Sequence, residues 1–93
     1  MDLENIIEYY FELNRRTAKK YYDGILILIK KLTKFPFLGR IVPEFEAFFG
    51  DKYRELIYEY FRIVYRVEKD QIIILRIIDG RKLFDLNILK EIY

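Results

Sequence analysis

The residues best suited to chemistry in this chain are basic side chains that recur in an otherwise apolar stretch, from Tyr53 to Lys82. They are Arg54, Arg62, Arg66, Arg76, Arg81 and Lys82. A guanidinium group can hold a phosphate through two parallel hydrogen bonds and can stabilise a developing negative charge. On a half-exposed sheet, such a set would suit RNA binding or RNA cleavage without a metal.

The same pattern also has a purely structural interpretation, in which acidic neighbours neutralise the arginines. Four carboxylates lie near enough in the sequence to do so, namely Glu55, Glu68, Asp70 and Asp79. The composition favours this interpretation, because surface charge pairs are common and carry little information about function. The remaining acidic pair, Glu44 and Glu46, is expected to be solvated in a loop.

Several classes of site are excluded by the absence of histidine and cysteine from the sequence. Without them there is no disulfide, no thiolate-ligated or histidine-ligated metal and no nucleophile–histidine pair. The sequence also has no glycine-rich nucleotide-binding motif. We therefore expect no cofactor, and any catalysis must use Arg, Lys, Tyr, Asp or Glu.

The length and composition indicate one folded domain over residues 1–93, with 53% hydrophobic residues and a net charge of +2. No apolar run reaches the roughly 18 residues of a membrane span. The start, Met1 to Glu4, is acidic and unlike a signal peptide. These features predict a cytoplasmic protein with no membrane association.

The charge is distributed unevenly along the chain. Residues 1–14 hold four acids and no base, residues 15–40 hold eight bases and one acid, and residues 41–93 hold nine bases and ten acids. The basic block indicates either an acidic partner, protein or nucleic acid, or two helices that dock their opposite charges.

Two helices are predicted before residue 35. The first spans Asp2 to Leu13, and the second runs to about Lys34 after a short break at residues 14–17, with Thr17 as a candidate N-cap. Pro36 ends the second helix. Phe35 to Gly50 is expected to be an irregular loop that its phenylalanines pin to the core.

Three strands are predicted next, at about Lys52–Tyr58, Phe61–Glu68 and Gln71–Asp79, followed by a short helix over Asp85 to Tyr93. Two-residue breaks between the strands indicate hairpins. The expected fold is therefore α+β, with a two-helix hairpin packed on one face of a small antiparallel β-sheet and a short C-terminal helix.

Alternation along the strands assigns their residues to two faces of the sheet. The face expected to meet the helices carries Arg54, Leu56, Tyr58, Phe61, Ile63, Tyr65, Val67, Ile72, Ile74 and Arg76. The opposite, mixed face carries Tyr53, Glu55, Ile57, Arg62, Val64, Arg66, Ile73, Leu75 and Ile77. Arg62 and Arg66 are thus predicted to lie on the side of the sheet away from the helices.

Four segments together resemble the RelE/ParE toxin superfamily of type II toxin–antitoxin systems. Residues 36–44 resemble its P-x-x-G-R-x-V-P-E loop, residues 53–56 its R-E-L strand, residues 61–66 its Y-R-I-V-Y-R strand, and residues 72–82 its last strand with a basic end. The resemblance covers nearly the whole chain.

The resemblance implies a toxin of a plasmid-stabilisation system, neutralised by a cognate antitoxin that wraps it as an extended or helical segment. ParE-like members inhibit DNA gyrase by protein binding. RelE-like members cut mRNA on the ribosome without a metal. The resemblance also implies a strand before the first helix. Only Met1 precedes the helix expected here, so we expect that strand to be absent, through either a truncated start or a real loss. The exposed sheet edge would favour a homodimer or pairing with the antitoxin.

For the nuclease branch, Arg62 matches the strand arginine, and Arg81 or Lys82 matches the basic residue after the last strand. However, Glu55 stands where that branch places a lysine, and Ile88 stands about where it places a tyrosine. A glutamate there would repel a phosphate and pair with Arg62. The residues therefore favour a ParE-like toxin over a RelE-like ribosome-dependent mRNA endonuclease.

Outside the nuclease set, Arg54, Tyr65 and Arg66 are the candidate binding residues. Glu55 and the missing strand also allow a third interpretation, an inactive toxin-fold remnant that serves as a dimerisation or binding module.

Overall fold

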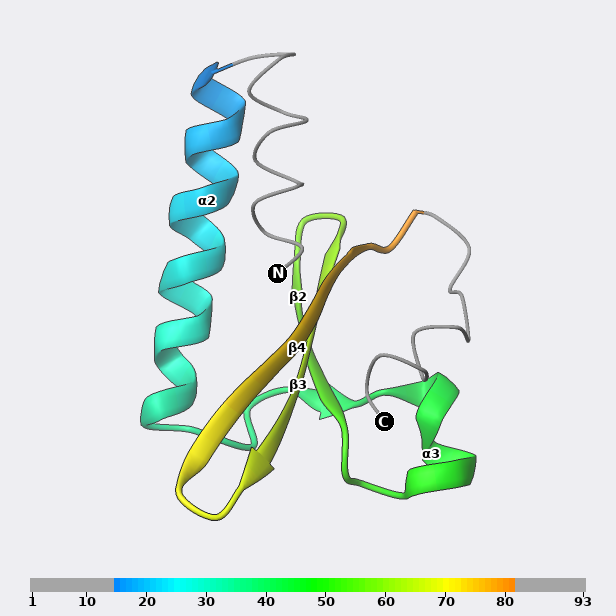
Figure 1. The fold of residues 1–93 in the computed structure, drawn as a ribbon. Coiled ribbons are helices and arrows are strands. Elements are labelled where there is room, and N and C mark those ends of the chain that lie inside the picture. The colour runs from blue at the N-terminus through cyan, green and yellow to red at the C-terminus, as the bar shows by residue number, and fades with distance from the viewer. Residues whose placement is uncertain (1–14, 82–93) are drawn as a thin grey trace.

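The computed structural model describes residues 15–81 (Figure 1). The elements in chain order are α2 (Arg15–Lys30), the 3-10 turn η1 (Lys31–Thr33), β1 (Arg40–Ile41), α3 (Pro43–Phe49), β2 (Arg54–Tyr58), β3 (Phe61–Glu68) and β4 (Gln71–Asp79). The α+β class is confirmed. The helices predicted over residues 2–13 and 85–93, and the expected loss of the first strand, lie outside the described residues.

Helix α2 differs from the prediction at both ends. Thr17 lies inside the helix, so its assignment as an N-cap is wrong, as is the predicted break in so far as it covers residues 15–17. Arginine has a high helix propensity, so nothing in Arg15-Arg16 interrupts the helix. At the other end the α-helix stops at Lys30 and continues as η1 to Thr33. No helix in the described part of the chain is long and apolar enough to cross a bilayer.

The three long strands form the predicted hairpins. β2 pairs antiparallel with β3, and β3 with β4, through the two-residue turns at 59–60 and 69–70. Glu59 and Lys69 adopt φ of 51° and 55°, a conformation that non-glycine residues rarely take. In the sheet formed by residues 15–81 the order is β1-β2-β3-β4, so β1 and β4 are its outer strands.

A bulge in β4 reverses part of the predicted face assignment. The β3–β4 register shifts between Val64 and Tyr65, so that Val64 lies opposite Arg76 and Ile63 lies opposite Ile77. Ile77 therefore joins the core on the α2 side, and Arg76 lies on the other side, which corrects both assignments. The cause is one extra residue in β4, which changes the side to which every later side chain points.

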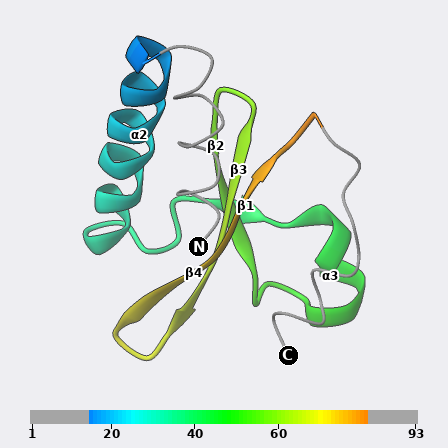
Figure 2. The ribbon, with the colours of Figure 1, turned by 45° about the horizontal axis from the view of Figure 1, so that its top comes forward.

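The sheet lies between α2 on one side and α3 on the other (Figure 2). The core on the α2 side contains Ile25, Leu32, Leu56, Phe61, Ile63, Tyr65 and Ile77. A smaller core on the α3 side contains Val42, Phe45, Tyr53 and Val64. The face predicted to be away from the helices is therefore partly covered.

The segment predicted to be an irregular loop contains a helix, which corrects that prediction. Pro43 occupies the first turn of α3, acidic residues follow it, and Gly50 ends the helix with φ of 62°. Proline and acids at the start and glycine at the end are favourable for helix formation. Of the phenylalanines expected to pin this segment, Phe45 and Phe49 do so, whereas Phe35, Phe37 and Phe48 are exposed.

Candidate functional site

Arg62, on the α3 side of the sheet, forms ion pairs with two carboxylates, those of Glu44 and Glu55. Its Nε donates to Glu55 Oε1 at 2.6 Å, and its Nη1 donates to Glu44 Oε2 at 2.6 Å. Its Nη2 donates to both carboxylates, at 2.7 Å to Glu44 and 3.0 Å to Glu55. Each guanidinium nitrogen therefore has a carboxylate partner, and the side chain is only 13% exposed.

Glu55 connects three strands through one buried carboxylate. Its side chain is fully buried, and its Oε2 accepts a hydrogen bond from Arg40 Nε at 2.8 Å. The pairing of Arg40 with Glu55 across β1 and β2 places these groups together, and β3 supplies Arg62. A carboxylate that is buried away from solvent requires such partners, because an unpaired buried charge is strongly destabilising.

The group formed by Arg40, Glu44, Glu55 and Arg62 is hereafter called the ion-pair network. The hydrogen bond from Arg62 holds the pKa of Glu44 below its usual value, although partial burial opposes this effect. The hydrogen bonds that Arg62 donates to Glu44 likewise raise the pKa of Arg62 above its usual value, with a further contribution from Glu55. The network holds two guanidinium groups and two carboxylates, so its formal charges balance.

Arg54 and Tyr65 form a second constellation, on the α2 side. They lie opposite each other across β2 and β3. Arg54 Nη1 donates to the Gly39 carbonyl at 2.9 Å, and the Gly39 N–H donates to the Tyr65 hydroxyl at 2.9 Å. A Cβ at Gly39 would come within 2.6 Å of the Glu55 carbonyl and 2.8 Å of the Tyr65 hydroxyl. Arg54 and Tyr65 therefore fix the turn before β1, and only glycine fits there.

Tyr65 is the most buried of the sequence-predicted binding residues. Its ring is fully buried, and burial raises the pKa of its hydroxyl. The described conformation therefore uses Tyr65 to hold the Gly39 turn.

Arg66 and Arg81 have carboxylate partners of their own. Arg66 Nε lies 3.1 Å from Glu68 Oε2. Arg81 makes a two-point contact with Asp79, at 3.0 and 2.7 Å, and its guanidinium lies 4.4 Å from the Tyr60 ring centroid. Lys82 lies outside the described residues. The predicted neutralisation of arginines by Glu55, Glu68 and Asp79 is thus confirmed for three of the arginines.

Arg40 and Glu44 belong to the ion-pair network, although neither is a site residue predicted from the sequence. Both belong to the P-x-x-G-R-x-V-P-E segment, so the motif itself was the signal that they act together. Glu44, expected to be solvated, is instead bound to Arg62, because Glu44 lies in the first turn of α3 and this turn lies over β3. Glu46 is exposed, as expected. Among residues 15–81 no group of three or more Asp or Glu side chains is arranged to hold a metal ion.

Comparison with known proteins gives one family. The family model described as ParE toxin of type II toxin-antitoxin system, parDE, matches residues 1–84. No curated protein matches the chain.

Proposed function

The chain belongs to the ParE toxin family of type II toxin–antitoxin systems, and from that premise we propose that it is the toxin of a plasmid-stabilisation system in the cytoplasm. In this proposal it acts by binding a protein of the DNA gyrase class rather than by cutting RNA. A cognate antitoxin neutralises it by binding the folded domain.

The observation that carries the choice of protein binding is the state of Arg62. A nuclease would need this guanidinium to contact the phosphate where charge develops. Here its nitrogens already donate to Glu44 and Glu55. A phosphate placed beside Arg62 would meet two carboxylates, and juxtaposed like charges cost several kcal/mol.

The predicted binding residues keep different roles in this proposal. Arg66 lies on β3 with a partly exposed side chain and an exposed partner, Glu68, so it can exchange that partner for an acidic group of another protein. Arg54 and Tyr65 act indirectly, because they hold the Gly39 turn and with it the surface around β1.

The test combines growth, gyrase and RNA readouts on one set of variants. Induced expression should stop growth, and the purified protein should inhibit supercoiling of relaxed plasmid by gyrase. Arg81→Ala, a change at an exposed ion pair, should inhibit supercoiling as strongly as the wild type. Arg62→Ala should do so too in preparations that circular dichroism shows to be folded.

Two results would overturn the proposal. If ribosome-bound mRNA is cut, and folded Arg62→Ala or Arg81→Ala protein no longer cuts it, the chain is a RelE-like endonuclease in which Arg62, Arg81 and Lys82 are the catalytic candidates. If induced expression leaves growth unchanged, the chain is not a toxin, and its fold serves only binding or dimerisation.

A further inference from the structure

The two carboxylates that bind Arg62 differ in how far solvent reaches them. The Glu55 side chain is fully buried on β2, which lies between β1 and β3 in the sheet, and it also contacts Arg40. The Glu44 side chain is 30% exposed and lies in the first turn of α3. Loss of Glu55 would leave charges inside the sheet uncompensated, whereas loss of the Glu44 side chain would open the Arg62 guanidinium to solvent. Glu44 is therefore the replaceable partner of Arg62.

The contact between Arg62 and Glu44 has the geometry in which arginine binds a phosphate. Arg62 Nη1 lies 2.6 Å from one carboxylate oxygen of Glu44, and Nη2 lies 2.7 Å from the other. The remaining nitrogen of the guanidinium, Nε, donates to Glu55, which fixes the orientation of the side chain. Carboxylates and phosphates accept the same pair of parallel hydrogen bonds from arginine. The Glu44 carboxylate thus occupies the position in which a phosphate would bind.

Arg40 places a second positive charge near this position. Its guanidinium is held by Glu55, and its side chain is 60% exposed. The hydrogen bond from Arg62 is the main cause of the lowered pKa of Glu44, and the charges of Arg62 and Arg40 lower this pKa further. An anion in place of the Glu44 carboxylate would therefore meet two cations and one remaining carboxylate.

We propose that the carboxylate of Glu44 closes a phosphate site formed by the guanidinium groups of Arg62 and Arg40. With Glu44 present, an incoming phosphate must displace a carboxylate that α3 holds beside Arg62, and like charges repel. Without Glu44, Arg62 remains oriented by Glu55 and its two-point contact is open. Glu44 thus excludes nucleic-acid phosphates from this site. Its bearing on the choice of a protein target rests on the proposed function, whereas the phosphate site is tested without gyrase.

The test is a titration of the full-length, isotope-labelled chain with inorganic phosphate at constant pH and ionic strength, followed by the amide signals of residues 40, 44 and 62. Glu44→Ala should bind phosphate at least tenfold more tightly than the wild type. Glu46→Ala is the matched control, because it removes the same charge from an exposed position of the same helix. Its affinity for phosphate should stay within twofold of that of the wild type.

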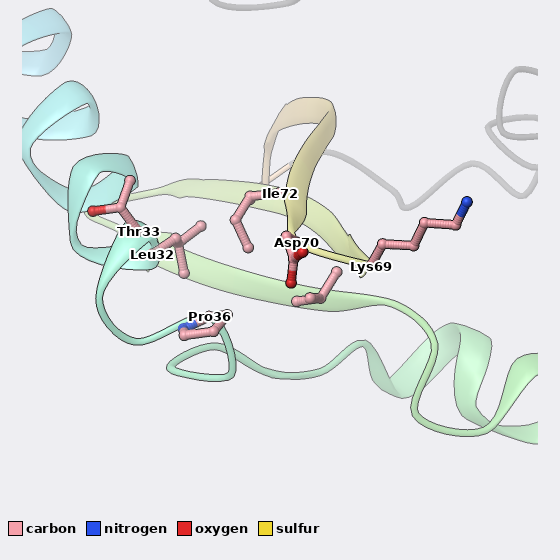
Figure 3. A pocket seen from close by; sticks show the side chains of 7 residues that line it. Leu32, Thr33, Pro36, Lys69, Asp70 and Ile72 are labelled. Atoms are coloured by element: carbon pink, nitrogen blue, oxygen red, sulfur yellow. The ribbon is translucent and has the colours of Figure 1, made fainter.

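Two double variants show whether the gain depends on Arg62. Glu44→Ala/Arg62→Lys keeps the net charge of Glu44→Ala but replaces the two-point donor by a point charge, so the affinity should fall at least fivefold. Glu44→Ala/Lys69→Ala removes a cation at the β3–β4 turn, where Lys69 extends outward beyond Leu32 and Ile72 (Figure 3). Its affinity should stay within twofold of that of Glu44→Ala. Glu44→Ser is a second variant with the site open, and circular dichroism must show that each variant is folded.

A labelled 12-nucleotide single-stranded RNA distinguishes the phosphate of a nucleic acid from the free ion. Glu44→Ala should bind this RNA at least fivefold more tightly than Glu46→Ala does, and Arg62→Lys should reverse the gain. Four results would overturn the proposal: no gain in phosphate affinity in folded Glu44→Ala or Glu44→Ser, an equal gain in Glu46→Ala, a gain that survives Arg62→Lys, or no gain for RNA. Failure of the proposed function is a separate result, because growth arrest and gyrase inhibition measure the toxin and the titration measures the phosphate site.

Discussion

On the side of the sheet that meets α2, the buried residues form one apolar core, whereas the side that meets α3 buries a carboxylate beside a smaller core. The α2 side buries Ile25 and Ile63 completely. The α3 side buries Glu55 to the same degree and balances it with Arg40 and Arg62. The stability of the α2 side therefore comes from the packing of apolar side chains. The stability of the α3 side depends in addition on the pairing of its buried charges.

This difference explains why alternation along β2 and β3 identifies both faces and yet does not reveal their chemistry. Leu56 and Glu55 are adjacent, and both are buried, but on opposite sides of the sheet. The charge of Glu55 suggests a half-exposed position. The side chain is nevertheless buried, because α3, which comes from a different part of the chain, covers that side of the sheet.

The largest expected effect is on the α2 side. Ile63→Ala removes a fully buried side chain and leaves a cavity, which should lower the free energy of unfolding by about 3–4 kcal/mol. Ile57→Ala, on β2 with its side chain half exposed, should lower it by less than about 1 kcal/mol. Urea denaturation followed by circular dichroism measures both. Equal losses would show that the α2 side is not the dominant core.

The next effect is on the α3 side and depends on charge. Glu55→Gln keeps the shape but removes the negative charge between Arg40 and Arg62, which should destabilise the fold by about 3 kcal/mol. Glu46→Gln, at an exposed position of α3, should change stability by less than about 0.5 kcal/mol. Thermal and urea unfolding at neutral pH measure the difference.

A double variant sharpens this comparison. Glu55→Leu/Arg62→Leu should lose less stability than the sum of the single variants, because no buried charge is left uncompensated. Additive losses would mean that Glu55 and Arg62 contribute independently, in conflict with the hydrogen bonds between them.

A smaller effect should depend on pH. In the folded state the pKa of Glu44 is lowered, so the unfolded state binds more protons, and the stability from Glu44 is lost as the pH falls below the usual pKa of 4.5 and through the lowered pKa of the folded state. Glu44→Gln should lose about 1 kcal/mol at pH 7. Its difference from the wild type should shrink at pH 3. A difference that is constant from pH 7 to pH 3 would contradict the ion pair between Glu44 and Arg62.

The smallest effect is expected at the end of β4. Arg81→Ala removes the ion pair of a half-exposed arginine with Asp79 and a contact with Tyr60, but the backbone N–H of residue 81 still donates to Asp79, so stability should change by no more than about 0.5 kcal/mol. Urea midpoints of this variant and the wild type should nearly coincide. A loss of stability as large as that of Glu55→Gln would contradict this prediction, because it would mean that Arg81 contributes as much to the free energy of unfolding as the buried charges do.

The sequence predicts the strands well because their pattern is local. Arg62 and Arg66 stand four residues apart in β3, an even spacing that puts both on one face of a strand, and short breaks at residues 59–60 and 69–70 flank β3, so both hairpins and the side on which Arg62 lies follow directly. The pairing of Glu55 with Arg62 was also predictable, because alternation puts both residues on one face.

The features that do not follow from the sequence depend on non-local packing, or lie in segments where polar and apolar residues do not alternate. Ile72 to Leu75 is uniformly apolar, so nothing marks the bulge that changes the positions of Arg76 and Ile77. Strand β1 has two residues, which is too short for a pattern. Helix α3 did carry local signals, Pro43 and Gly50, but its position over Arg62 is a tertiary fact.

The balanced charges around Glu55 have a consequence for how a partner first meets this protein. Two cations and two carboxylates held within hydrogen-bond distance produce a field that fades faster with distance than that of a single net charge. These arginines therefore do little to accelerate diffusional encounter. Lys30, Lys31 and Lys34 have no acidic residue between them, and their attraction extends over about a Debye length, roughly 8 Å at physiological salt. An acidic partner should therefore approach the end of α2 first, with an association rate that falls as salt is added.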